Sequence, residues 1–145
     1  MDVHDCYDKG LLKKGIPDME ISRKSISIAL KKLKRAKKLI KLKVYEETIT
    51  NSYSAMFHAS RALLFKDGVR EKSHYGLFLY IKENYSDKLE KRFINELNAL
   101  RMERHEINYG LDEPEIEEED ARHAVKTAED FLGTINKMIC GVGSR

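Results

Sequence analysis

The sequence predicts an all-α protein, an up-and-down bundle of four long helices with one short extra helix. Between Pro17 and Pro114, three glycines and no proline interrupt the chain, so helices can run long. Apolar residues recur at spacings of three and four over most of that stretch. No segment shows a persuasive alternation with the period of two that a half-buried strand requires.

The first two helices are the best defined. The first is expected from about residue 18 to residue 43, and its apolar stripe includes Ile26, Leu33 and Ile40. The second is expected from about residue 46 to residue 66. Its many small residues would let neighbouring helices approach closely.

The later helices are predicted from their ends. Ser73 is the predicted N-cap of the short helix, and Ser86 that of the next long helix. That helix should end near Tyr109, with Gly110 in the left-handed conformation. The last helix is expected to begin at Pro114, because proline suits a first turn. We therefore predict an N-terminal tail (residues 1–17), a helical bundle (residues 18–140) and a C-terminal tail (residues 141–145).

Composition places the chain among small soluble proteins. Of its 145 residues 41% are hydrophobic and 35% charged, typical of one helical domain with its own core. No apolar run approaches the ~20 residues of a membrane span, and no signal peptide begins the chain. Cys6 and Cys140 form neither a disulfide framework nor a zinc pattern. We predict a cytoplasmic protein that needs no membrane, metal or cofactor.

Charge is strongly segregated along the chain. The segment from Arg23 to Lys43 holds ten basic residues and no acid, and the segment from Asp112 to Asp120 holds seven carboxylates and no base. The two blocks can contact each other, or the basic block can face phosphates. A third interpretation is that both are solvated surfaces that keep the protein in solution.

The segment Arg104-His-Glu-Ile-Asn-Tyr109 is the candidate site. On a helix Arg104 and Asn108 share a face, and His105 shares faces with Arg101 and with Tyr109. An imidazole can take the proton of a ribose 2′-hydroxyl while a guanidinium stabilises charge on the phosphate, so Arg104 and His105 would be the catalytic pair of an enzyme. The segment can equally bind without catalysis, or be structural, with Arg104 paired to Glu103 or Glu106. His58 is interpreted as a core histidine.

Three motifs together resemble a known family. The segment from Tyr53 to Leu64 is similar to a helix that reads Tyr-Tyr-Ala-x-Phe-x-Ala-x-x-Ala-Leu-Leu, with Ser54 in place of the second Tyr. His74-Tyr75-Gly76 resembles a His-x-Gly element, and Arg104, Asn108 and Tyr109 resemble an Arg, polar, Tyr element. The chain is thus similar to the HEPN superfamily, most of all to its compact prokaryotic group often encoded beside minimal nucleotidyltransferases.

The resemblance, together with the small residues of the second helix, implies a homodimer, and it implies that His74 lies near the cleft. It also implies a minimal nucleotidyltransferase as partner, with Tyr109 as the residue that such an enzyme would modify. Ribonuclease members carry a His separated from the Arg by four to six intervening residues, whereas Tyr109, Gly110 and Leu111 occupy those positions here. Asn108 cannot serve as the base, because an amide does not titrate near neutral pH.

We therefore expect a HEPN-type binding module in a toxin–antitoxin-like system, paired with a minimal nucleotidyltransferase and binding RNA or nucleotide. Its expected binding residues are Arg101, Asn108, Tyr109, His74 and Tyr53. The alternative is a metal-independent endoribonuclease of the toxin type, with Arg104 and His105 at the dimer cleft.

Overall fold

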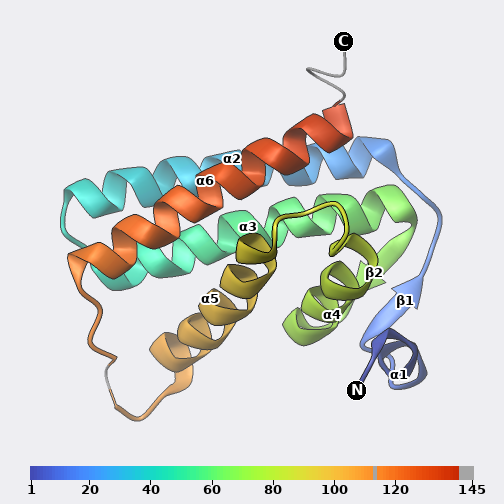
Figure 1. Ribbon diagram of the computed structural model, residues 1–145, viewed down its shortest axis with the longest axis horizontal. Helices are drawn as coiled ribbons and strands as arrows, with labels where there is room; N and C mark the ends of the chain where they lie inside the picture. Colours follow the sequence, from blue (N-terminus) through green and yellow to red (C-terminus); the bar gives the residue numbers. More distant parts are fainter. Residues whose placement is uncertain (113, 141–145) are drawn as a thin grey trace.

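The computed structural model describes residues 1–112 and 114–140, and this part of the chain is a helical bundle (Figure 1). The all-α prediction is confirmed. The structure adds a short helix at the N-terminus and a two-stranded antiparallel sheet, neither of which the sequence predicted. The elements are α1 (Val3–Asp8), β1 (Leu12–Lys14), α2 (Met19–Lys41), α3 (Tyr45–Asp67), β2 (Val69–Glu71), α4 (His74–Tyr85), α5 (Lys91–Tyr109) and α6 (Glu118–Cys140).

Helix α3 is the centre of the bundle and contacts α2, α4, α5, α6 and β2. Figure 1 shows α2 and α6 along one side of α3, with α5 crossing on the other side. Small side chains make this close packing possible, since Ala55, Ala59 and Ala62 are completely buried. Two hydroxyls of α2 also bond to the backbone of α3: Ser22 Oγ donates to Ala62 O and Ser25 Oγ to His58 O, both at 2.7 Å.

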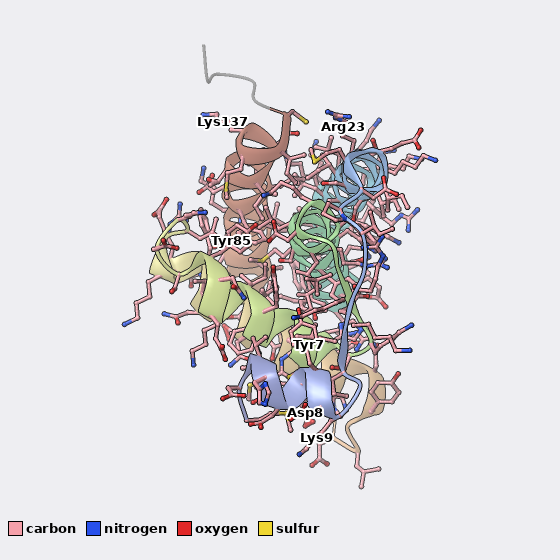
Figure 2. The ribbon with its side chains drawn as sticks, turned by 90° about the vertical axis from the view of Figure 1, so that its right-hand side faces the viewer. Tyr7, Asp8, Lys9, Arg23, Tyr85 and Lys137 are labelled. Carbon is pink, nitrogen blue, oxygen red and sulfur yellow. The ribbon has the colours of Figure 1, made fainter. Side chains whose placement is uncertain are left out.

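The first seventeen residues contribute to the core. Cys6 of α1 is fully buried and Leu12 of β1 is 1% exposed, whereas Ile16 is 81% exposed. Strand β1 pairs with β2, and Gly68 just before β2 has a φ of +81°. A Cβ on Gly68 would lie 2.8 Å from Pro17 Cδ, so glycine is required there for two reasons. Figure 2 shows α1 at the opposite end of the molecule from Arg23 and Lys137.

Helix ends agree with the sequence in some places and differ in others. The Ser73 cap is confirmed, because its Oγ accepts a hydrogen bond from the backbone N–H of Gly76 at 2.8 Å. The Ser86 cap is wrong: Ser86 ends α4, and α5 begins at Lys91. The intervening turn brings Leu89 into the core at 5% exposure, which delays the start of α5.

Two predictions around the acidic loop are also wrong. Gly110 has a φ of −69° and is extended, because the chain leaves α5 straight rather than turning back. Glycine at this position instead allows the backbone to pass close to Glu106, since a Cβ on Gly110 would lie 2.6 Å from Glu106 O. Helix α6 begins at Glu118 rather than Pro114. At this start the backbone N–H of Glu117 donates to the Asp120 carboxylate at 3.0 Å. None of the helices in the described ranges has the length and hydropathy for crossing a membrane.

Candidate functional site

A cleft of about 310 Å³ lies where α2, α3, α4 and α5 meet. Its lining combines two permanent cations, two imidazoles, hydroxyls and an amide, and no lining residue carries a carboxylate. A surface of donors and cations without an acid attracts anions. The lining residues are Lys32, Thr50, Asn51, Tyr53, Ser54, Phe57, His58, His74 and Arg104. We call this hollow the Arg104 cleft.

Helix α3 supplies most of the lining because of its residue spacing. Ser54 follows Thr50 by four residues, and Phe57 and His58 follow Ser54 by three and four, so these residues lie along one face of the helix. The opposite side carries the buried small residues that pack against α2 and α6. The polar stripe therefore faces outward between α2 and α5, where it borders the cleft.

Three rings form the wall near the start of α4. The Tyr53 hydroxyl and His74 Nδ1 are 2.8 Å apart, and Tyr53 is 2% exposed. Phe57 stacks on His74 with 4.4 Å between ring centroids and an interplanar angle of 29°. Gly76 lets α4 start close to the N-terminal segment, because a Cβ there would lie 2.9 Å from Leu11 O. The His-Tyr-Gly motif thus has a physical role, which is to place His74 against α3.

Both imidazoles have a lowered pKa. Burial lowers the pKa of His74, and the guanidinium groups of Arg104 and Arg101 lower it further. Burial likewise lowers the pKa of His58 to about 4, with contributions from Arg61, Lys32 and His74. At neutral pH the histidines are therefore uncharged, and the charge of the cleft comes from Arg104 and Lys32.

Arg104 is half-buried on α5 and faces the cleft. Within the described residues it forms no ion pair and no hydrogen bond, so neither Glu103 nor Glu106 neutralises it. Among residues 1–112 and 114–140, Arg104 is therefore not found as one half of an ion pair. A half-buried guanidinium beside a cleft is available to an anionic ligand.

The other predicted residues of α5 do not line the cleft. Arg101 lies over the rings of Tyr75 and Phe78, at 5.2 and 5.8 Å, and bonds to Asn98 Oδ1. Its charge nevertheless acts on the cleft, because it is the third contribution, behind burial and Arg104, that lowers the pKa of His74. His105 is exposed, with its ring centroid 5.0 Å from that of Tyr109. Asn108 and Tyr109 are exposed as well.

Of the predicted site residues, the structure thus brings together Arg104, His74 and Tyr53. Sequence reasoning missed Lys32 and the stripe of α3, and His58 is half-buried at the cleft rather than a satisfied core histidine. Its Nδ1 is buried without a hydrogen-bond partner. The available signal was the run of polar residues at spacing four, Thr50, Ser54 and His58, on an otherwise small and apolar helix. Among the described residues, no group of three or more His, Cys, Asp or Glu is placed to hold a metal ion.

Comparison with known proteins agrees with this architecture. The family model described as HEPN domain matches residues 22–138, most of the chain. The chain belongs to the HEPN family. This HEPN protein is also 31% identical over 136 residues to a protein of Methanocaldococcus jannaschii named "Putative toxin MJ0605". The aligned region covers 90% of the present chain and 96% of that relative.

The whole Arg104 cleft lies inside the matched HEPN region, from Lys32 to Arg104. In this HEPN domain the imidazoles of the cleft come from α3 and α4, while His105 of α5 lies outside it. Chemically, the arrangement can hold an anion between two cations and several hydrogen-bond donors.

Proposed function

We propose that this HEPN protein is a toxin-type binding module that holds a phosphate group of RNA or a nucleotide in the Arg104 cleft without cutting it. The observation that carries the proposal is the cleft itself, where four helices converge with cations and donors and without a carboxylate. Similarity to a protein named as a toxin supports the assignment to a toxin–antitoxin-like system.

The residue chemistry suits a phosphate. The planar guanidinium of Arg104 can bond two phosphate oxygens at once, and Lys32 adds a mobile point charge. Ser54 and the second N–H of the Asn51 amide provide neutral donors along the same wall, whereas the Thr50 hydroxyl donates to Glu47 O. Of the ten residues in the basic block, Lys32 is the one that lines the cleft, and Lys37 pairs with Glu129 of α6. The rest of the block supplies a longer-range field that attracts polyanions.

Binding is tested with a 5′-labelled single-stranded RNA by fluorescence anisotropy over a range of salt. We expect affinity to fall with a slope of about 0.7 log units per log unit of salt for each phosphate contacted. Arg104→Ala should weaken binding about tenfold or more and lower that slope. The matched control is Arg92→Ala, which removes an exposed cation at the other end of the same helix. Equal losses in both variants, or binding insensitive to salt, would contradict the proposal.

A second candidate function is a metal-independent endoribonuclease. One observation favours it: the cleft places two imidazoles beside Arg104, although they are His58 and His74 and not His105. RNA incubated with the protein in EDTA would then acquire 2′,3′-cyclic phosphate ends. Variants Arg104→Ala, His58→Ala and His74→Ala would identify the groups involved, and His105→Ala would test the histidine favoured from sequence. Absence of cleavage by folded protein that binds the RNA would decide for the binding module.

The proposed partner is a minimal nucleotidyltransferase, with Tyr109 as the group that it modifies. Support comes from the position of Tyr109, which is 65% exposed at the end of α5. Incubation with such an enzyme and a nucleoside triphosphate should add a nucleotidyl mass to wild type and not to Tyr109→Phe. Tyr75→Phe, another exposed tyrosine, is the control. A modification that persists in Tyr109→Phe would refute this assignment.

A further inference from the structure

We infer that Tyr53 fixes the tautomer of His74, so that His74 offers its Nε2–H to the bound anion as a hydrogen-bond donor. His74 is then an anion-binding residue, and Tyr53 is a positioning residue that acts through it. This inference rests on the proposed function for the presence of the anion. The tautomer itself is a property of the unliganded protein.

The first step concerns the Tyr53 hydroxyl. Tyr53 is 2% exposed, and within the described residues His74 Nδ1 is the one partner of its hydroxyl, at 2.8 Å. A buried O–H without an acceptor loses its hydrogen bond to water and gains nothing in return. If Nδ1 carried the proton and donated it to the phenol oxygen, the buried Tyr53 O–H would have no acceptor among the described residues. Tyr53 must therefore donate, and Nδ1 must accept.

The second step concerns the protons on the ring. Burial raises the pKa of the Tyr53 phenol far above its usual range, so the hydroxyl keeps its proton. Burial, Arg104 and Arg101 lower the pKa of His74, so its imidazole is neutral at pH 7 and carries a single proton. With Nδ1 occupied as an acceptor, that proton lies on Nε2.

The third step concerns whether Nε2 is free to bond a ligand in the cleft. Nδ1 is engaged with α3, and stacking on Phe57 at 4.4 Å holds the plane of the ring. Nε2 makes no hydrogen bond to any described residue, and His74 lines the Arg104 cleft. His74 also borders an adjoining hollow that contains Glu71, whose carboxylate accepts a hydrogen bond from Arg61 Nε at 3.1 Å and none from a described atom of His74.

The consequence is chemical. A general base must present a bare nitrogen to the proton that it removes, and His74 presents an N–H instead. With Arg104 and Lys32 it completes a set of donors around one space, which an anion can accept from all sides. The same hydrogen bond that orders the wall of the cleft thus favours binding over cleavage.

The first measurement is ¹⁵N–¹H correlation NMR of the imidazole rings of the unliganded wild type at pH 7. We expect His74 to show the Nε2–H tautomer. In Tyr53→Phe, which keeps the ring and removes the donor, the resonances should move to a mixture of tautomers. Tyr75→Phe removes a neighbouring hydroxyl without touching Nδ1 and should leave them unchanged. An Nδ1–H tautomer in the wild type overturns the inference. This result does not depend on whether any variant folds.

The second measurement is affinity for the labelled single-stranded RNA. In His74→Gln the amide nitrogen can take the place of Nε2–H, so affinity should stay within about threefold of wild type. In His74→Asn the shorter amide reaches the Nδ1 position, and affinity should fall about tenfold. A wild type that fails to bind RNA refutes the proposed function. A wild type that binds while His74→Gln loses affinity as much as His74→Asn refutes the role assigned to His74.

Discussion

At the scale of single residues, His58 shows how the cleft affects stability. Its ring is half-buried between α2, α3 and α4, near the cations Lys32 and Arg61, and its Nδ1 has no hydrogen-bond partner. Burial first, and these charges second, lower the pKa of His58 from 6.5 to about 4. The folded protein therefore resists protonation of His58 far more than the unfolded chain does.

This difference predicts a pH dependence of stability. Above pH 6.5 His58 is neutral in both states and has no effect. Between pH 6.5 and about 4 the unfolded chain binds a proton that the folded chain excludes, so the free energy of unfolding falls as the pH falls. We expect His58→Gln to reduce that loss by about 1 kcal/mol, allowing for screening by solvent. Urea unfolding at pH 7.5 and 4.5 measures it.

The control for that experiment is Thr50→Ser, which changes a side chain of the same cleft and removes no titratable group. It should leave the pH dependence as it is in the wild type. His74 contributes a loss of the same sign, because its pKa is also lowered, so His58→Gln should flatten the dependence without abolishing it. A dependence equally steep in wild type and His58→Gln would contradict the prediction.

The residues of the site were only partly predictable from sequence, for a geometric reason. Arg104, His74 and Tyr53 were found through motifs, and they do meet at one cleft. His105 was favoured as its neighbour, but successive residues of a helix point about 100° apart, and the structure leaves His105 in solvent. Lys32 was hidden among ten basic residues, because which of them faces inward depends on how α2 is rotated against α3.

At the scale of elements, long helices were predictable and short pieces were not. The periodic stripes of α2 and α3 located both helices to within two residues of their ends, because burial of one face repeats over several turns. Strands β1 and β2 are three residues each, too short to show a period of two. Helix α1 was missed because its six residues are also too few to show a periodic pattern, although Asp2 and Asp5 form a capping box around its first turn.

The N-terminal segment gives a prediction at this scale. Leu12 of β1 is 1% exposed, whereas Ile16, four residues later, is 81% exposed. Leu12→Ala should lower the free energy of unfolding by about 2–4 kcal/mol, because it leaves a cavity in the core. Ile16→Ala should change it by less than about 0.5 kcal/mol. Chemical denaturation of the two variants measures the contrast, and equal small effects would show that the segment is a dispensable tail.

At the scale of the whole molecule, we propose that exposed apolar side chains of α5 form the surface at which a second copy binds. Helix α5 exposes 56% of Met102 and 65% of Tyr109, on the same helix that carries Arg104. Exposed apolar side chains that share one helix face are typical of an interaction surface. A two-fold axis beside this face of α5 would cover both residues in each copy, and it would leave each Arg104 cleft on the other side of α5, because residues two apart on a helix point in nearly opposite directions.

We therefore expect sedimentation equilibrium to give a mass about twice the 16.8 kDa of the chain. Met102→Glu should shift the protein toward monomer, because a dimer would bury its charge. Leu42→Glu changes a side chain that is 71% exposed at the far end of α2, and should leave the dimer intact. A mass of one chain at every concentration, or equal dissociation by both variants, would exclude this interface. Because Met102 and Arg104 lie on opposite sides of α5, the RNA affinity of the Met102→Glu monomer then shows whether the cleft of one copy binds RNA on its own.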